Sequence, residues 1–234
     1  MSIDLAVSTV IFALRTSEDA ADVAPGEEAE PAGLSIPLVR RTREPYLGRW
    51  ALPGGGATES ESLADTAARK LFETTQLAPA YLEQLYAFGD VDRSPSGRVV
   101  SIVYWALVRG DEAAQTRESE NVRWFAADEL PDLAFDHNAI VDYALWRLRS
   151  KLEYSRIAHA FLGETFTLTR LRQVYEVVLQ KPIDPANFRR QVEATRAIVP
   201  TGEHVTGGRH RPPRLYRYDT SVELVDNGPL TRTI

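Results

Sequence analysis

The alternation of apolar and polar positions in the first half of the chain is typical of β-strands. Four runs rich in Val, Ile, Leu or Phe are strand candidates, and they cover residues 4–14, 34–41, 82–90 and 98–108. The last run, RVVSIVYWALV, is almost continuously apolar, which favours a strand in the middle of a sheet. An acidic stretch at residues 18–33 has almost no large apolar side chain, so we expect it to be a surface loop between two paired strands.

Helical spacing interrupts this pattern twice. Leu63, Ala67 and Leu71 recur at intervals of four residues, and apolar side chains repeat in the same way through residues 136–152. Strands with two helices between them predict an α/β or α+β sandwich for a first domain of residues 1–152.

Residues 153–234 form a second predicted domain that begins with two helices. Thr167 can cap the first of them, whose apolar positions follow at steps of three and four. After a tight turn at residues 180–183, Asp184 is a good N-cap and Pro185 suits the first position of the second helix.

The rest of this domain predicts a wing. Phe188 and Val192 face inward in the second helix, which leaves its polar side chains for the surface. Residues 201–208 are expected to be a loop, and residues 214–218 (RLYRY) a strand. Two helices, a tight turn and a final strand together predict a winged helix-turn-helix.

Charge is distributed unevenly between the two domains. The 234 residues have a net charge of −6, but residues 165–218 contain 10 Lys+Arg against 4 Asp+Glu, a net charge of +6. Such asymmetry favours a nucleic-acid-binding end, and an uneven distribution by chance is the alternative.

Several classes of protein are excluded by composition. The chain has no cysteine, which excludes disulfides, thiolate metal sites and cysteine nucleophiles. No apolar run approaches the roughly 20 residues that cross a bilayer, and the first 14 residues lack the basic start of a secretory signal. We therefore expect a cytoplasmic protein without a membrane segment.

Residues 53–77 carry the most specific motif in the chain, PGGGATESESLADTAARKLFETTQL. This stretch is similar to the Nudix box, G-x5-E-x7-R-E-U-x-E-E-x-G-U, in which U is a bulky aliphatic residue. The matching positions are Gly55, Glu61, Arg69, Leu71, Glu73 and Leu77. The resemblance implies a Nudix-type αβα sandwich for the first domain.

The box is degenerate at the positions that would bind metal. Positions 70, 73 and 74 share one face of a helix, and in the Nudix family they are three carboxylates that gather divalent cations against a diphosphate. Here they are Lys70, Glu73 and Thr74, so the formal charge of this face changes from −3 to 0. Gln76 also replaces the glycine that would end the helix.

We therefore expect a pocket that binds a ligand without hydrolysing it. No catalytic residue is predicted, and no cofactor is required, although Glu61 and Glu73 are enough for weak binding of one Mg²⁺ ion. The glycines allow close approach of a phosphate, arginine forks suit phosphate, and indole faces suit bases. The predicted ligand-binding residues are Arg49, Trp50, Gly55, Gly56, Lys70, Glu73, Asp92 and Arg93.

The assignments of Lys70 with Glu73 and of Trp50 to the ligand each have a structural alternative. Lys70 could be a solvated lysine, with Glu73 acting only as the i+4 partner of Arg69. Trp50 is equally suited to the core.

Basic and polar side chains of the second domain are placed to bind DNA. Asn187, Arg189 and Arg190 are candidates for base edges in the major groove. Contacts to backbone phosphates and a basic wing are predicted for Thr167, Thr169, Arg170, Arg172, Arg209, His210, Arg211 and Arg214. Decoration of a solvated face is the alternative for any single arginine. His159 and His204 lack metal-ligand spacing.

A degenerate Nudix domain followed by a winged helix resembles the NrtR family of Nudix-related transcriptional regulators. The segments FTLTRLRQVYEVVL, DPANFRRQV and RPPRLYRY look like the DNA-binding end of that family. The resemblance implies a dimeric bacterial repressor of NAD biosynthesis or salvage genes that binds palindromic operator DNA and responds to ADP-ribose or a related metabolite. The alternatives are an active hydrolase of ADP-ribose or another nucleoside diphosphate derivative, and a scaffold that binds protein through the winged helix.

Overall fold

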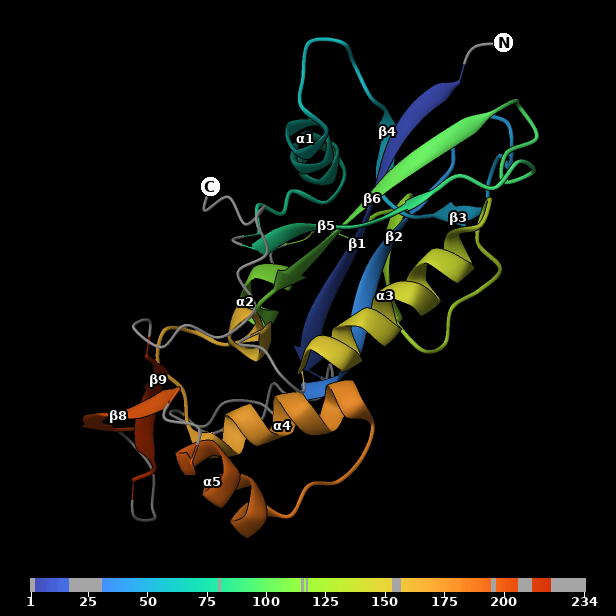
Figure 1. Cartoon of the computed structure of the whole chain (residues 1–234). Coiled ribbons are helices and arrows are strands. Elements are labelled where there is room, and N and C mark those ends of the chain that lie inside the picture. Colours follow the sequence, from blue (N-terminus) through green and yellow to red (C-terminus); the bar gives the residue numbers. More distant parts are fainter. Residues whose placement is uncertain are drawn as a thin grey trace. The chain divides into compact units, whose positions relative to one another are not determined.

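The computed structural model divides the chain into two compact units (Figure 1). The first contains residues 35–147 with 1–13 and 229–234, and the second contains residues 148–228 with 14–34. The structure describes residues 3–16, 31–79, 81–114, 116, 118–152, 157–194, 197–205 and 212–219. No helix in this described part is long and apolar enough to cross a membrane.

A mixed seven-stranded sheet is the centre of the first unit. Its strands are β1 (Asp4–Thr16), β2 (Pro31–Arg40), β3 (Trp50–Ala51), β4 (Gly54–Gly56), β5 (Tyr81–Phe88), β6 (Val99–Val108) and β7 (Val122–Ala126). The order is β3-β2-β1-β6-β5, with β4 paired to β1 and β7 paired to β2. β1 and β6 run parallel. The expected pairing of the first two strands and the inner position of the fourth run are confirmed.

The prediction of a loop at residues 18–33 is wrong for residues 31–33. Residues 31–33 already belong to β2, because pairing with a neighbouring strand satisfies their backbone in spite of their Pro-Ala-Gly composition. Residues 18–30 lie outside the part of the chain that the structure describes.

Helices cover both sides of the sheet. Figure 1 shows α1 (Leu63–Thr75) and α3 (His137–Leu152) on opposite sides of it. Leu71 of α1 packs in one apolar cluster with Ile11 of β1 and Ala106 of β6. This arrangement is the predicted αβα sandwich. A short helix, α2 (Gly110–Ala113), was not expected from the sequence.

Position 54, where β4 pairs with β1, requires glycine. A Cβ atom added to Gly54 would lie 2.3 Å from the carbonyl oxygen of Val7, a fixed backbone atom. Any other residue at position 54 would therefore push β4 away from β1. The glycine turn of the box is thus held against the sheet and leads directly into α1.

The second unit is a winged helix-turn-helix. It contains the 3-10 helix η2 (Ile157–Phe161), α4 (Leu168–Leu179), α5 (Pro185–Ala194), β8 (Ile198–His204) and β9 (Arg214–Tyr218). Both predicted caps are confirmed: the Thr167 hydroxyl accepts a hydrogen bond from the Arg170 amide at 3.1 Å, and the Asp184 carboxylate accepts one from Asn187 at 2.8 Å.

The wing is a two-stranded antiparallel sheet, which corrects the predicted loop at residues 201–208. Residues 201–204 belong to β8, which pairs with β9 from Ile198 to His204. Pro200 and Gly202 made this segment look unlike a strand, but β8 and β9 form the whole sheet, so β8 has an edge that tolerates Pro200. Residues 206–208 lie outside the described residues.

Replacement of Gln76 by glycine is expected to stabilise the protein. Gln76 ends α1 in the left-handed conformation (φ 62°), where its amide donates to the Phe72 carbonyl oxygen at 2.9 Å. Because a left-handed L-residue costs about 1–2 kcal/mol and glycine does not pay this cost, Gln76→Gly should raise the free energy of unfolding by about 0.5–1 kcal/mol in urea denaturation.

Gln76→Ala is the matched control. It keeps the unfavourable φ and loses the side-chain hydrogen bond to the Phe72 carbonyl oxygen (3.1 Å), so it should be less stable than the wild type. Equal stability of the glycine and alanine variants would contradict the assignment of strain to this position.

Candidate functional site

The polar side chains of the box form one ion-pair network on α1. Arg69 donates to both carboxylate oxygens of Glu61, at 2.8 and 2.7 Å, and to Glu73 at 2.8 Å. Lys70 Nζ lies 3.0 Å from the other carboxylate oxygen of Glu73. Hydrogen bonds from Arg69 lower the pKa of Glu61 to about 2, and those from Arg69 and Lys70 lower the pKa of Glu73. Both carboxylates are therefore ionised and already paired with cations.

This network does not fit the divalent metal that an intact Nudix box binds. The Lys70 ammonium lies on Glu73, where a cation would have to bind, and the Thr74 hydroxyl donates to the Lys70 carbonyl oxygen at 2.6 Å. Within the described residues, no group of three or more His, Asp or Glu side chains could hold a metal ion. The box can stabilise its helix, but it lacks the oxygen ligands of a metal centre.

A cavity of about 500 Å³ lies beside the glycine turn in the first unit. Its walls come from β1, the end of β2 with the loop that follows, the glycine strand β4, the loop at residues 93–96, β6 and the start of α3. Its charged lining residues are Arg40, Arg41, Arg43 and Arg93, and the described lining contains no Asp or Glu. A cavity of this size and charge suits a small anionic ligand with several phosphate oxygens.

The arginines of this cavity differ in their surroundings. Arg93 is buried and forms two hydrogen bonds with Asp136, at 2.9 and 2.7 Å, so its charge is already balanced. Arg41 lies 4.6 Å from the ring centre of Phe135 and donates to the Pro45 carbonyl oxygen at 2.7 Å, which fixes its direction.

The remaining two arginines are exposed at the mouth of the cavity. Arg40 uses its Nε to donate to the Gly48 carbonyl oxygen at 3.1 Å. Arg43 uses its backbone carbonyl to accept from Arg41 at 3.4 Å, and its own guanidinium has no hydrogen-bond or ion-pair partner among the described residues. Guanidinium groups remain available there to bind phosphate.

His137 is the buried polar group of the same cavity. Its Nδ1 accepts a hydrogen bond from the Leu52 amide at 2.9 Å, and burial lowers the pKa of its imidazole to about 4. The ring is therefore neutral near pH 7, with its proton on Nε2. The backbone before it is unusual, because Phe135 has a left-handed φ of 58°.

The structure brings only part of the predicted ligand set to this cavity. Gly55, Gly56 and Arg93 line it, whereas Arg49, Trp50, Lys70, Glu73 and Asp92 are not among its lining residues. Asp92 is exposed on its loop. The Trp50 ring instead packs edge-on against Phe125, with ring centres 5.1 Å apart.

Lys70 lies close to the cavity without lining it. A Cβ atom added to Gly55 would lie 3.2 Å from Lys70 Cε, so the lysine stem packs over the glycine turn. Sequence reasoning missed Arg40, Arg41, Arg43, Phe135 and His137. The run RRTR at the end of a strand could have indicated the arginines, but no local pattern distinguishes Phe135 and His137.

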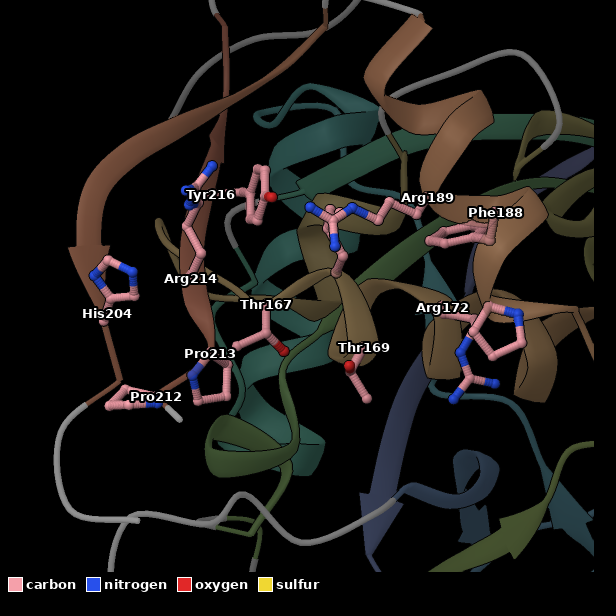
Figure 2. Close-up of a pocket in the computed structure, with 12 residues that line it drawn as sticks. Thr167, Thr169, Arg172, Phe188, Arg189, His204, Pro212, Pro213, Arg214 and Tyr216 are labelled. Atoms are coloured by element: carbon pink, nitrogen blue, oxygen red, sulfur yellow. The ribbon is translucent and has the colours of Figure 1, made fainter. Parts of the chain in front are cut away.

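A second cavity, of about 460 Å³, lies in the winged-helix unit between α4, α5 and the wing (Figure 2). The predicted DNA-binding residues that line it are Thr167, Thr169, Arg172, Arg189 and Arg214. Figure 2 shows Arg189 reaching from α5 toward Tyr216 of β9. Hydroxyl and guanidinium donors from three elements thus surround one hollow, as binding to a phosphate backbone requires.

Other predicted DNA-binding residues lie elsewhere in this unit. Arg170 does not line the cavity. Asn187 and Arg190 are exposed on α5, and the Arg190 guanidinium donates to the Asn187 side-chain oxygen. Arg209, His210 and Arg211 lie outside the residues that the structure describes.

Two arginines of the second cavity have acidic partners on their own helices. Arg172 pairs with Glu176 at 2.5 Å, and Arg189 pairs with Glu193 at 2.9 Å, each four residues further along. The Arg189–Glu193 pair is exposed, so it contributes little to stability and Arg189 can turn to a phosphate. The Arg172–Glu176 pair is half-buried, and Glu176 also accepts a hydrogen bond from the Ile183 amide, so Arg172 is held more firmly.

The geometry agrees with matches to known families. The model for the NUDIX domain matches residues 19–144, and the model for the NrtR DNA-binding winged helix domain matches residues 158–218. The ADPR responsive transcriptional repressor NtrR of Acinetobacter baylyi is 33% identical over 190 residues, which cover 79% of this chain and 76% of that protein. The chain belongs to the NrtR family. The predicted family and fold are therefore confirmed.

Two further relatives of this NrtR-family chain are informative. The crystal structure of Shewanella oneidensis NrtR complexed with a 27-mer DNA superimposes with a TM-score of 0.73 and 36% sequence identity, covering 92% of this chain and 93% of that one. An ADP-ribose pyrophosphatase of Methanocaldococcus jannaschii is 35% identical over 113 residues, which cover 48% of this chain and 67% of that enzyme. The regulator structure thus covers 92% of this chain, whereas the match to the enzyme covers about half of it.

Acid should destabilise the protein through His137. The pKa of His137 is about 4 when folded, against an ordinary value of 6.5, so the unfolded chain binds more protons between these two pH values. The free energy of unfolding should therefore fall by about 3 kcal/mol as the pH is lowered from about 6.5 to about 4, measured by urea denaturation.

His137→Asn is the matched control, because an asparagine oxygen can replace Nδ1 as acceptor for the Leu52 amide without titrating. Carboxylates such as Glu61 titrate in both proteins and cancel in the comparison. Parallel pH profiles for the wild type and the variant would contradict this prediction.

Proposed function

We propose that this NrtR-family chain is a transcriptional repressor that binds operator DNA through its winged-helix unit and senses ADP-ribose or a related NAD metabolite in the arginine-lined cavity. The observation that carries the proposal is the combination of two neighbouring sites in the first unit. A cavity with four arginines and no carboxylate among its described lining residues adjoins a box whose two carboxylates are paired with Arg69 and Lys70. The first suits a diphosphate, and the second does not suit its hydrolysis.

The relatives support both halves of the proposal. The Acinetobacter baylyi relative is named as a repressor that responds to ADPR, and the Shewanella oneidensis structure contains DNA. Regulation of NAD biosynthesis or salvage genes rests on the family resemblance. We further propose a homodimer on a palindromic operator, because two-fold symmetric DNA is matched by a two-fold symmetric protein.

Loss of hydrolysis is part of the proposal. Nudix chemistry uses divalent cations held by carboxylates, and here Lys70 and Thr74 stand at two of the three positions for them. We propose that no cofactor is required. The competing function is hydrolysis of ADP-ribose or a related compound. Similarity to the Methanocaldococcus jannaschii enzyme supports it, and such hydrolysis would need weak Mg²⁺ binding by Glu61 and Glu73.

Gel-shift binding to upstream palindromic DNA tests the regulatory function. The full chain should bind such DNA, ADP-ribose should change the affinity, and no turnover of ADP-ribose should be detected with Mg²⁺ or Mn²⁺. Arg190→Ala should weaken binding by about 1–3 kcal/mol if Arg190 contacts a guanine.

Arg109→Ala is the control for the loss of one positive charge. Arg109 lies in the first unit and pairs with Asp111 at 2.5 Å, so its loss should leave DNA binding unchanged. Efficient turnover of ADP-ribose without DNA binding would overturn the proposed function in favour of the hydrolase.

Restoring the missing carboxylates should restore metal binding. Lys70→Glu combined with Thr74→Glu would place three carboxylates on one face of α1, so Mg²⁺ or Mn²⁺ affinity measured by calorimetry should rise at least tenfold. Phe72→Glu is the control, because Phe72 is exposed on the same helix but points away from that face. Unchanged metal affinity in the double variant would show that Lys70 and Thr74 are not what excludes the ion.

A further inference from the structure

The arginine-lined cavity has two parts that differ in burial and charge. Arg40 and Arg43 are exposed at its mouth. Ser8, Ser101 and His137 are only 6%, 1% and 6% exposed, and all three line the same cavity. We call these three side chains the floor. Its groups are uncharged, because the His137 imidazole is neutral near pH 7.

The topology places the floor residues side by side. Ser8 of β1 and Ser101 of β6 lie on adjacent strands, and their hydroxyl oxygens are 3.1 Å apart. Gly54 is the register partner of Ser8, and Leu52 holds His137 through its amide. Since two residues of chain span at most about 7 Å, the imidazole and the serine pair border one small patch.

The floor has unused hydrogen-bonding capacity. His137 Nδ1 accepts from Leu52, which leaves the Nε2 proton, and that proton has no acceptor among the described residues. The serine pair uses one O–H in its mutual bond, so one O–H and several lone pairs remain. The floor therefore offers both neutral donors and neutral acceptors.

We infer that the floor is a subsite for the hydroxyl groups of a sugar, while the phosphates of the same ligand bind to the arginines at the mouth. A sugar hydroxyl both donates and accepts, as the floor does, whereas a phosphate only accepts. The buried cation of this cavity, Arg93, is already paired with Asp136, so it would not balance the charge of a phosphate buried at the floor. This inference rests on the proposed function and adds to it. The cavity selects a ribose-bearing diphosphate over a diphosphate without a sugar.

Calorimetry of the full chain with ADP-ribose and inorganic pyrophosphate tests the subsite, with pyrophosphate measured by competition. Ser101→Ala and His137→Asn should each weaken ADP-ribose about 3- to 10-fold and leave pyrophosphate unchanged, as expected for one lost hydrogen bond. Arg43→Ala should weaken both ligands. His137→Asn keeps an acceptor for the Leu52 amide, so its backbone support remains.

A double variant addresses the case in which Ser101→Ala misfolds because it leaves the Ser8 hydroxyl unpaired. Ser8→Ala combined with Ser101→Ala removes both hydroxyls and leaves neither one unpaired, and it should weaken ADP-ribose at least as much as Ser101→Ala. Wild-type affinity of the floor variants for ADP-ribose, or an equal loss for both ligands, would overturn the subsite alone. Failure of the wild type to bind ADP-ribose would instead overturn the proposed effector, and the subsite with it.

Discussion

The close contact between β4 and β1 is the constraint on which the first unit depends. Gly54 lies so near the Val7 carbonyl oxygen that no Cβ fits, and this contact holds the segment from Leu52 to Gly56 against the sheet. The same segment donates to His137 through Leu52 and lines the cavity through its glycines. It then leads into α1, which carries the rest of the box. One backbone contact thus positions both the arginine-lined cavity and the face of α1 that carries Lys70, Glu73 and Thr74.

Gly55 separates two different uses of positive charge. On the α1 side, the Lys70 stem packs over the glycine and its ammonium binds Glu73, so the charge is used inside the protein. On the cavity side, arginines from β2 and its following loop line the cavity. In a Nudix enzyme, divalent metal ions bind both the carboxylates of the box and the diphosphate. Here the positive charge beside the box and in the cavity comes from lysine and arginine side chains. This difference supports the proposed recognition without hydrolysis.

Helix α3 connects the ligand cavity with the second unit along the chain. Its first residue is His137, and its residues from Leu148 onward belong to the second unit. There Arg149 donates to the Val178 carbonyl oxygen in the last turn of α4, at 2.9 Å. A ligand that engages His137 would therefore act at the beginning of a helix that ends beside a DNA-binding helix.

The sequence by itself determined what depends on neighbours along the chain. Box spacing identified the Nudix fold, and Thr167, Asp184 and Pro185 marked the starts of α4 and α5, because caps and helical faces involve residues only a few positions apart. The loss of carboxylates at positions 70 and 74 was also readable, since i, i+3 and i+4 positions share a face in any helix.

Only the tertiary structure decided which residues share the ligand cavity. Ser8 meets Ser101 across 93 positions of sequence, and Leu52 meets His137 across 85. Trp50 is a residue that the sequence assigned to the ligand and the structure does not. Its indole ring suited a base, but the ring packs against Phe125. Strand β8 was missed for the same reason, since pairing with β9 outweighs its Pro and Gly. Such contacts depend on strand order and register, which no local pattern of residues encodes.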